Sequence, residues 1–159
     1  VDSAGNPIGH ATNFLVSAAL NVNAPDIDKE IGVLRKKIES GADYLITQPL
    51  YDLSIYERFM ARYAELHGPL DRPVLVGLLP LNSLKNAIFL HNEVPGITIP
   101  EAIMKRMEDA DSRAAAEGVV IAQELAEQLH HLAAGVYLLP QFNRYDLLAE
   151  VVESVRQRA

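Results

Sequence analysis

The chain has 159 residues, 49% of them hydrophobic, and no cysteine, which fits one domain with a sizeable core and excludes disulfides, thiolate metal sites and a cysteine nucleophile. Its net charge of -7 argues against nucleic acid or an anionic membrane surface as the main partner. Apolar runs are far shorter than the roughly 20 residues of a membrane helix and no signal peptide is visible, so we expect a cytoplasmic protein.

Taken in chain order, hydrophobic periodicity and cap residues predict four strands and six helices. The first strand is expected over 13–21, which is apolar on both faces like a buried parallel strand. A helix then starts behind the N-cap Asp26 and ends at Gly41. The later elements are expected as strands over 44–47, 74–79 and 136–139, and as helices over 52–66, 83–92, 100–110, 112–134 and 146–156.

The alternation of strands and helices indicates an α/β fold with a parallel sheet and right-handed crossovers. Four β/α units are half of a (β/α)8 TIM-type barrel, whose usual length is about 250 residues. A small open sheet is the alternative. We treat 1–159 as a single domain, and because it begins with Val1 in a loop-like stretch, we expect it to be a piece of a longer protein.

Polar side chains follow the predicted strands at their C-terminal ends, where ligands bind in such folds. These residues are amides, hydroxyls and one guanidinium: Asn21, Gln48, Asn82, Ser83, Gln141, Asn143 and Arg144. The absence of Lys, Asp or Glu at the very end of a strand argues against a Schiff-base aldolase and a metal-dependent enolase type. Amide recognition of a polar heterocycle, with a cofactor doing the electron transfer, fits better.

Each of these signals has a plainer interpretation. Gln48 alone fits a helix-capping or solvent-facing amide equally well. Lys36 and Lys37 on the first helix are typical of a solvated face rather than a phosphate clamp. Gly77 inside a strand marks a close approach by another backbone or a ligand.

Three longer stretches carry a more specific pattern. They are GADYLITQPLYD (41–52), GLLPLNSLKNAIFLHNEVPGITIPE (77–101) and GVYLLPQFNRYDL (135–147). In order and spacing they resemble the C-terminal half of the methylenetetrahydrofolate reductase family. The Gln48-Pro49 pair and the lead-in GNPIGHATNF (5–14) resemble the bacterial two-domain type, in which a homocysteine methyltransferase precedes the reductase.

This resemblance implies a (β/α)8 barrel that holds FAD, with the present strands as the fifth to the eighth. The glutamine matching Gln48 contacts nicotinamide and folate in turn, so NAD(P)H and a folate are the implied ligands. Phe142 and Arg144 match positions at the folate edge, and Asn86 matches an amide that meets folate. Glu30, Lys36 and Lys37 match positions on the helix that holds the ribose and pyrophosphate of FAD.

The chain departs from the family pattern at several of these positions. The family's stacking aromatic in the third helix falls on Leu90, with Phe89 one place away, and other FAD or folate positions fall on Leu20, Ala24 and Val33. The glutamate of the first barrel strand and the aspartate of an Arg-Gly-Asp motif are not in this chain. The isolated chain is therefore expected to be inactive.

Two other readings stay open at this point. The chain could be a non-catalytic half-barrel that self-associates through its exposed apolar face. It could also belong to an eightfold-barrel enzyme that binds another phosphorylated ligand.

Overall fold

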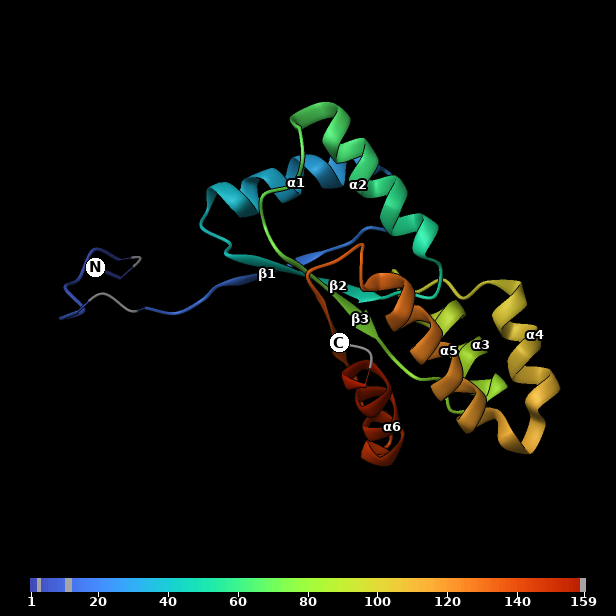
Figure 1. The fold of residues 1–159 in the computed structure, drawn as a ribbon. Coiled ribbons are helices and arrows are strands. Elements are labelled where there is room, and N and C mark those ends of the chain that lie inside the picture. Colours follow the sequence, from blue (N-terminus) through green and yellow to red (C-terminus); the bar gives the residue numbers. More distant parts are fainter. Residues whose placement is uncertain (3, 11–12, 158–159) are drawn as a thin grey trace.

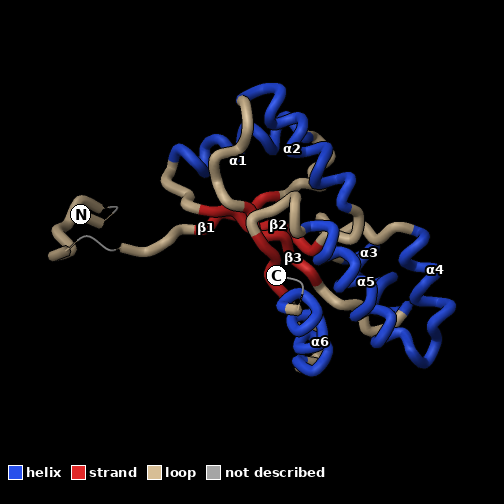
Figure 2. Tube along the Cα trace, viewed as in Figure 1, coloured by secondary structure: helices blue, strands red, loops and turns tan. Residues whose placement is uncertain are grey.

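The computed structural model describes residues 1–2, 4–10 and 13–157. Figure 1 shows a central sheet with α1 and α2 packed over one part of it and with α3, α4 and α5 gathered over another. The described residues before β1 (1–2, 4–10 and 13–16) extend away from the body without helix or strand (Figures 1 and 2).

The elements follow one another as strands and helices with one helical insertion. The strands are β1 (Ser17–Leu20), β2 (Tyr44–Pro49), β3 (Val74–Leu78) and β4 (Gly135–Leu138). The helices are α1 (Ile27–Glu39), α2 (Leu53–His67), α3 (Leu84–Glu93), α4 (Glu101–Ala110), the 3-10 turn η1 (Asp111–Arg113), α5 (Ala114–Leu129) and α6 (Tyr145–Arg156).

The four strands form one parallel sheet in the sequential order β1-β2-β3-β4. Sequential order means that every crossover leads to the adjacent strand, as in a barrel, whereas a doubly wound sheet reverses its order at a switch point. The α/β class predicted from the sequence is therefore confirmed. The arrangement is compatible with part of a TIM barrel.

The two faces of the sheet differ in burial because successive side chains alternate between them. One face carries side chains that are fully buried under the helices, among them Leu45, Val76 and Leu78. On the other face the register aligns Ala19, Ile46 and Leu75, and these positions keep some exposure. The sheet is thus covered on one face and open on the other.

Several predicted element boundaries are confirmed by their caps. Asp26, Asp52 and Ser83 each accept a hydrogen bond from a backbone N–H in the first turn of the following helix. For α3 the sequence offers Asn82 or Ser83 as the cap, and the structure selects Ser83. Pro100 precedes α4 as its cap residue, although the sequence placed it in the first turn.

Two predicted boundaries are wrong. The first strand begins at Ser17 instead of residue 13, and Phe14 and Leu15 are each 79% exposed, because an apolar segment forms a strand only where a neighbouring strand pairs with it. The long helix expected over 112–134 starts at Ala114, after η1, and ends at Leu129. Asp111, whose φ of 46° breaks the helical path, ends α4 just before it.

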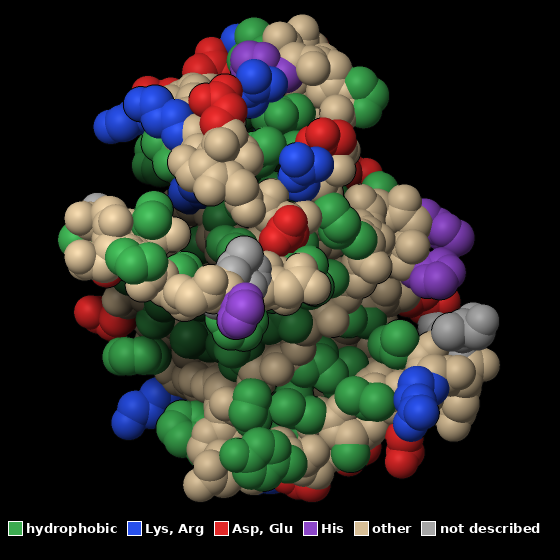
Figure 3. Space-filling view, turned by 90° about the vertical axis from the view of Figure 1, so that its left-hand side faces the viewer, with side chains coloured by type: hydrophobic (Ala, Val, Ile, Leu, Met, Phe, Trp, Pro, Cys, Tyr) green, Lys and Arg blue, Asp and Glu red, His purple; other side chains and the backbone are tan. Residues whose placement is uncertain are grey.

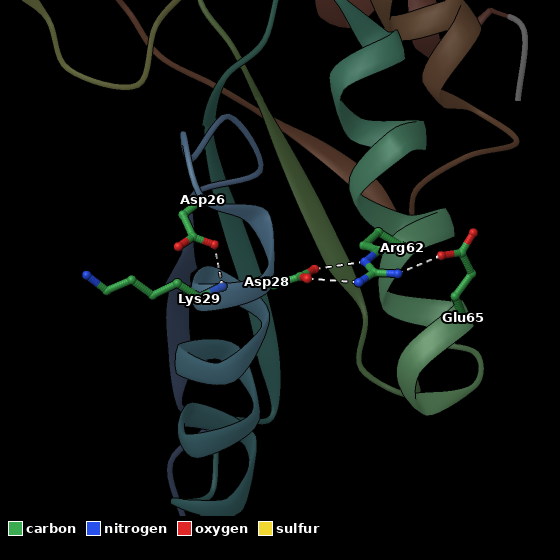
Figure 4. A network of polar contacts seen from close by, with 5 residues as sticks. All are labelled: Asp26, Asp28, Lys29, Arg62 and Glu65. Carbon is green, nitrogen blue, oxygen red and sulfur yellow. Dashed lines mark hydrogen bonds and ion pairs between the residues drawn. The ribbon is translucent and has the colours of Figure 1, made fainter.

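A polar network joins the first two helices (Figure 4). The guanidinium of Arg62 on α2 donates to both carboxylate oxygens of Asp28 on α1, at 2.8 Å each, and to Glu65 at 3.0 Å. These hydrogen bonds hold the pKa of the Asp28 carboxyl below its ordinary value. The bidentate geometry fixes the relative rotation of α1 and α2 more firmly than a single contact would.

A glycine lets α5 approach the segment that follows β3. A Cβ on Gly118 would lie 1.9 Å from the carbonyl oxygen of Leu81, so only hydrogen fits there. Arg106 on α4 completes the packing of α5 through Glu117 and Glu124, at 2.7 and 2.6 Å.

On the face drawn in Figure 3, charged and hydrophobic side chains gather in different parts. In the view of Figure 3, charged side chains lie mainly over the upper part, which corresponds to α1 and α2, whereas hydrophobic side chains crowd the lower part. Among the described residues, no helix combines the length and the apolar character needed to cross a bilayer.

Candidate functional site

The C-terminal ends of the four strands meet at one edge of the sheet because all of them run parallel. Gln48 lies at this edge and is exposed. The sequence placed it just after the strand, whereas the structure includes it in β2. A register shift against β3 between Ile46 and Pro49 marks an irregularity at this point.

Side chains from two other positions fix the backbone around Gln48. The Thr47 hydroxyl accepts a hydrogen bond from the Gly77 N–H at 3.2 Å and donates to the Gln48 carbonyl at 2.7 Å. The Tyr137 hydroxyl donates to the Thr47 carbonyl. The close backbone approach expected at Gly77 is confirmed, because a Cβ there would lie 3.1 Å from the Pro49 backbone nitrogen, and the Tyr137 hydroxyl oxygen would lie still closer, at 2.9 Å.

A hollow of about 360 Å³ opens beside Gln48. Its lining combines strand residues with two charged residues of α1 and one tyrosine of β4: Ala19, Leu20, Asn21, Glu30, Lys37, Ile46, Thr47, Gln48 and Tyr137. Three residues singled out in the sequence, Glu30, Lys37 and Gln48, are therefore brought together.

The charges in this hollow are arranged along the edge of β1. The Lys37 ammonium donates to the Ala19 carbonyl at 2.6 Å and lies 3.6 Å from a carboxylate oxygen of Glu30. The same Glu30 oxygen accepts from the Asn21 N–H at 3.3 Å. Lys36 is exposed and does not line the hollow, so the structure separates the two neighbouring lysines.

The loop between α3 and α4 crosses over the ends of β1 and β2. Its Gly96 has a φ of 84°, and a Cβ there would lie 3.3 Å from Cγ of Gln48 and 3.5 Å from Oδ1 of Asn21. Thr98 accepts a hydrogen bond from the Asn23 amide at 2.7 Å. This loop therefore limits the space above Gln48.

Asn86 forms an amide pair with Gln141, from the loop after β4. The Asn86 Nδ2 donates to Gln141 Oε1 at 2.8 Å, and Gln141 Nε2 donates to Asn86 Oδ1 at 3.2 Å. Gln141 Nε2 also donates to the Pro80 carbonyl, and the Asn82 N–H donates to Asn86 Oδ1. The Asn86 Oδ1 accepts two hydrogen bonds, whereas Nδ2 donates one to Gln141 and keeps a second N–H that a ligand could accept.

Phe142 and Arg144 lie on the same exposed loop after β4. Phe142 and Asn143 have positive φ values of 50° and 59°, and the Phe142 ring is 75% exposed. Arg144 donates to the carboxylate of Asp146 at 2.6 Å, which raises the pKa of Arg144 and lowers that of Asp146. The loop thus presents an uncovered aromatic ring beside a paired guanidinium.

The exposure of Leu90 and Phe89 shows which of the two could stack on a ligand. Leu90, the residue in register with the family aromatic, is 7% exposed in the core, whereas Phe89 is 57% exposed. Leu20 is also buried, at 1%. Ala24 and Val33 are partly buried. Among these positions, only Phe89 offers an aromatic surface to a ligand.

Tyr137 and Asn23 are site residues that the sequence interpretation did not single out. Tyr137 carries no local signal, because the glycine that makes room for it, Gly77, lies on another strand and only the strand register aligns the two. Asn23 sits in a loop, and only the three-dimensional path of residues 94–100 brings it to Thr98. No local pattern signals such a contact.

Parallel strands, intervening helices and a polar hollow at the strand ends place this chain among α/β proteins compatible with part of a TIM barrel. The model of the methylenetetrahydrofolate reductase family matches residues 2–156, and the chain belongs to this family.

Individual relatives match at low identity. A methylenetetrahydrofolate reductase (NADH) 1 of Arabidopsis thaliana is 25% identical over 111 residues, which are 67% of this chain and 18% of the relative. Methylenetetrahydrofolate reductase 1 of Schizosaccharomyces pombe is 27% identical over 115 residues, 70% of this chain and 18% of the relative. The chain thus spans about a fifth of the length of these relatives.

A solved structure shares the fold. It is an uncharacterized protein from Clostridium thermocellum that binds two copies of 5-methyl-5,6,7,8-tetrahydrofolic acid. The match has a TM-score of 0.60 and 17% identity, and covers 91% of this chain and 53% of that one.

Proposed function

We propose that the parent protein of this chain reduces 5,10-methylenetetrahydrofolate to 5-methyltetrahydrofolate, using NAD(P)H as hydride donor and FAD as cofactor. The chain supplies the four C-terminal β/α units of its (β/α)8 barrel. The observation that carries the proposal is the hollow in which Gln48, Glu30 and Lys37 meet, in a chain of this family. The NADH in the names of plant relatives supports NADH as the donor, and the folate bound by the clostridial protein supports a folate ligand.

The residues of the hollow fit part of FAD. The Lys37 ammonium has three N–H donors, of which the Ala19 carbonyl accepts one, while Glu30 is an ion-pair partner at 3.6 Å, so donors remain for a phosphate oxygen. The Glu30 carboxylate is an acceptor suited to ribose hydroxyls. When bound, FAD supplies the two-electron chemistry that no side chain can perform. Lys36 lies outside the hollow and serves as the comparison residue.

Gln48 has a positioning role in this proposal. Its amide offers one acceptor and two donors, which match the carboxamide of nicotinamide and the polar edge of a pterin. Holding each ligand in turn beside the flavin lowers the barrier through proximity rather than through proton transfer. In this proposal Phe142, Arg144, Phe89 and Asn86, which do not line the hollow, contact the folate beyond it, where the aromatic rings can stack and the guanidinium can meet a carboxylate.

The same proposal predicts that the isolated chain is inactive. The acid that protonates folate and the aspartate beside the flavin belong to the N-terminal half of the barrel, which this chain does not contain. The test is to mix the chain with FAD, NADH and menadione and to follow NADH oxidation. Turnover above the FAD-only control would contradict the prediction of inactivity.

Binding tests the assignment without requiring activity. Titration of FAD with the chain should quench flavin fluorescence, and Gln48→Ala should leave this quenching intact because Gln48 contacts the substrates instead. Unchanged fluorescence over the whole titration would leave open another phosphorylated ligand in the same barrel type.

Two further parts of the proposal concern the parent protein. The Gln48-Pro49 pair and the lead-in 5–14 support the two-domain type with a preceding homocysteine methyltransferase; residues 11–12 of that lead-in lie outside the described residues. A cytoplasmic location is part of the same proposal. The sequence upstream of Val1 tests the reductase assignment through the glutamate of the first barrel strand and the Arg-Gly-Asp motif, and it tests the two-domain type through the presence or absence of a methyltransferase domain.

The open sheet face supports a second candidate function, a half-barrel that pairs with a second copy. Exposed apolar residues precede β1 at the edge of this face, and Phe14, Leu15 and Val16 are 79%, 79% and 50% exposed. Burial of such a surface would stabilise a homo-oligomer. Analytical ultracentrifugation over a range of concentrations tests this candidate, and a monomer throughout would exclude it.

A further inference from the structure

Tyr137, in the middle of β4, reaches across the sheet to β2. Its hydroxyl donates a hydrogen bond to the Thr47 carbonyl although β3 lies between the two strands. The path is open because Gly77 of β3 is in register with Tyr137 and has no side chain to block the phenol. Because residue 77 has no side chain, a side chain of β4 can reach the backbone of β2.

The carbonyl that Tyr137 binds belongs to the peptide bond between Thr47 and Gln48. The Thr47 hydroxyl holds the next carbonyl, that of Gln48, and is itself anchored by the Gly77 N–H. Consecutive carbonyls are thus fixed from two sides at the point where β2 departs from regular register with β3. This is the backbone from which the Gln48 side chain projects.

We propose that Tyr137 is a positioning residue for Gln48: by holding the Thr47–Gln48 peptide, it sets the direction in which the Gln48 amide faces the hollow. Tyr137 and Gln48 both line that hollow. The consequence for ligands rests on the proposed function of Gln48, whereas the effect on the orientation of Gln48 does not.

The chain contains a matched control for this hydrogen bond. The Tyr56 hydroxyl also donates to a backbone carbonyl, that of Leu132, at 3.2 Å, although Tyr56 is buried whereas Tyr137 is partly exposed. Tyr56 lines a separate hollow with Pro69, Leu70 and other residues, and Gln48 is not among them. Tyr56→Phe removes the same chemical group and the same kind of bond without touching the Gln48 peptide.

The first measurement needs no ligand. In ¹⁵N-labelled chain, the side-chain NH₂ signal of Gln48 is assigned by its loss in Gln48→Glu, and its order parameter is measured in wild type, Tyr137→Phe and Tyr56→Phe. Tyr137→Phe should shift this signal, lower its order parameter and speed hydrogen exchange at the Gly77 amide by about three- to tenfold, the loss expected for one net hydrogen bond. Tyr56→Phe should leave all three unchanged.

The second measurement connects this orientation to binding. With 5-methyltetrahydrofolate as the probe, Tyr137→Phe should weaken affinity by about three- to tenfold, and Tyr56→Phe should bind as wild type does. Gln48 signals that are the same in Tyr137→Phe and wild type would overturn the proposal. If those signals move while wild type binds no folate, the positioning stands and the ligand role of Gln48 in this chain fails.

Discussion

Replacement of Gly118 by alanine tests the packing of α5 against the segment after β3. The new methyl group would lie 1.9 Å from the Leu81 carbonyl oxygen and 2.8 Å from the Leu81 nitrogen. Because ordinary contacts exceed 3 Å and the obstacle is backbone, no rotamer change relieves the clash, and α5 or the Leu81 segment must move by about 1 Å.

The expected magnitude follows from two opposing effects. Overpacking of this kind costs about 1–3 kcal/mol or more, while alanine gains about 1 kcal/mol over glycine in a helix. With an obstacle that cannot rotate away, we expect a net loss of about 2 kcal/mol. For a chain of this size that loss lowers the melting temperature by roughly 5 °C.

Gly32 provides the control, because it lies inside α1 and a Cβ there would meet nothing within 4 Å. Gly32→Ala should stabilise the chain by about 0.5–1 kcal/mol through helix propensity alone. Urea unfolding followed by circular dichroism at 222 nm measures both variants. If Gly118→Ala proved as stable as wild type, the close approach of α5 to Leu81 would be refuted.

Two further predictions concern charged residues. Lys37→Ala should weaken FAD binding by about tenfold or more, the loss expected for a charge-assisted hydrogen bond, while Lys36→Ala should not; equal effects in flavin-fluorescence titrations would contradict the geometry. The Arg144 hydrogen bonds lower the pKa of the Asp146 carboxyl from its ordinary 3.8. Their contribution to folding stability is therefore complete above pH 3.8 and is lost as the pH falls through the lowered pKa of the folded chain. Arg144→Gln should raise the pKa of the Asp146 carboxyl toward its ordinary value in a ¹³C NMR titration, and an unmoved midpoint would show that the pair does not form in solution.

Most of the fold could be predicted because the local signals agree with one another. The periodicity of α1, the cap residues Asp26 and Asp52 and the apolar strands all indicate the same β/α repeat, and local consistency of this kind specifies structure. The early start assigned to the first strand failed for a non-local reason. Phe14 has strand-like character, but a strand is defined by its neighbours, and the sequence does not record where pairing begins.

The site was predictable only in part. The C-terminal ends of parallel strands had to meet, so Gln48 and Asn21 could be placed on one edge from the strand pattern alone. The amide pair of Asn86 and Gln141 joins residues 55 positions apart, and the selection of Lys37 over Lys36 depends on the rotation of α1. Such contacts follow from packing geometry, which single-residue chemistry does not encode.

The contact between Lys37 and Ala19 also bears on aggregation. β1 is an edge strand of the described sheet, and an unpaired edge is a template on which another chain can add a strand. The ammonium of Lys37 occupies one of the carbonyl oxygens that an added strand would need, and it brings a charge that such a strand would have to displace. In the isolated chain the lysine therefore opposes the addition of a foreign strand at β1, and in the proposed barrel the pairing of β1 with the fourth strand would have to release Lys37 from the Ala19 carbonyl.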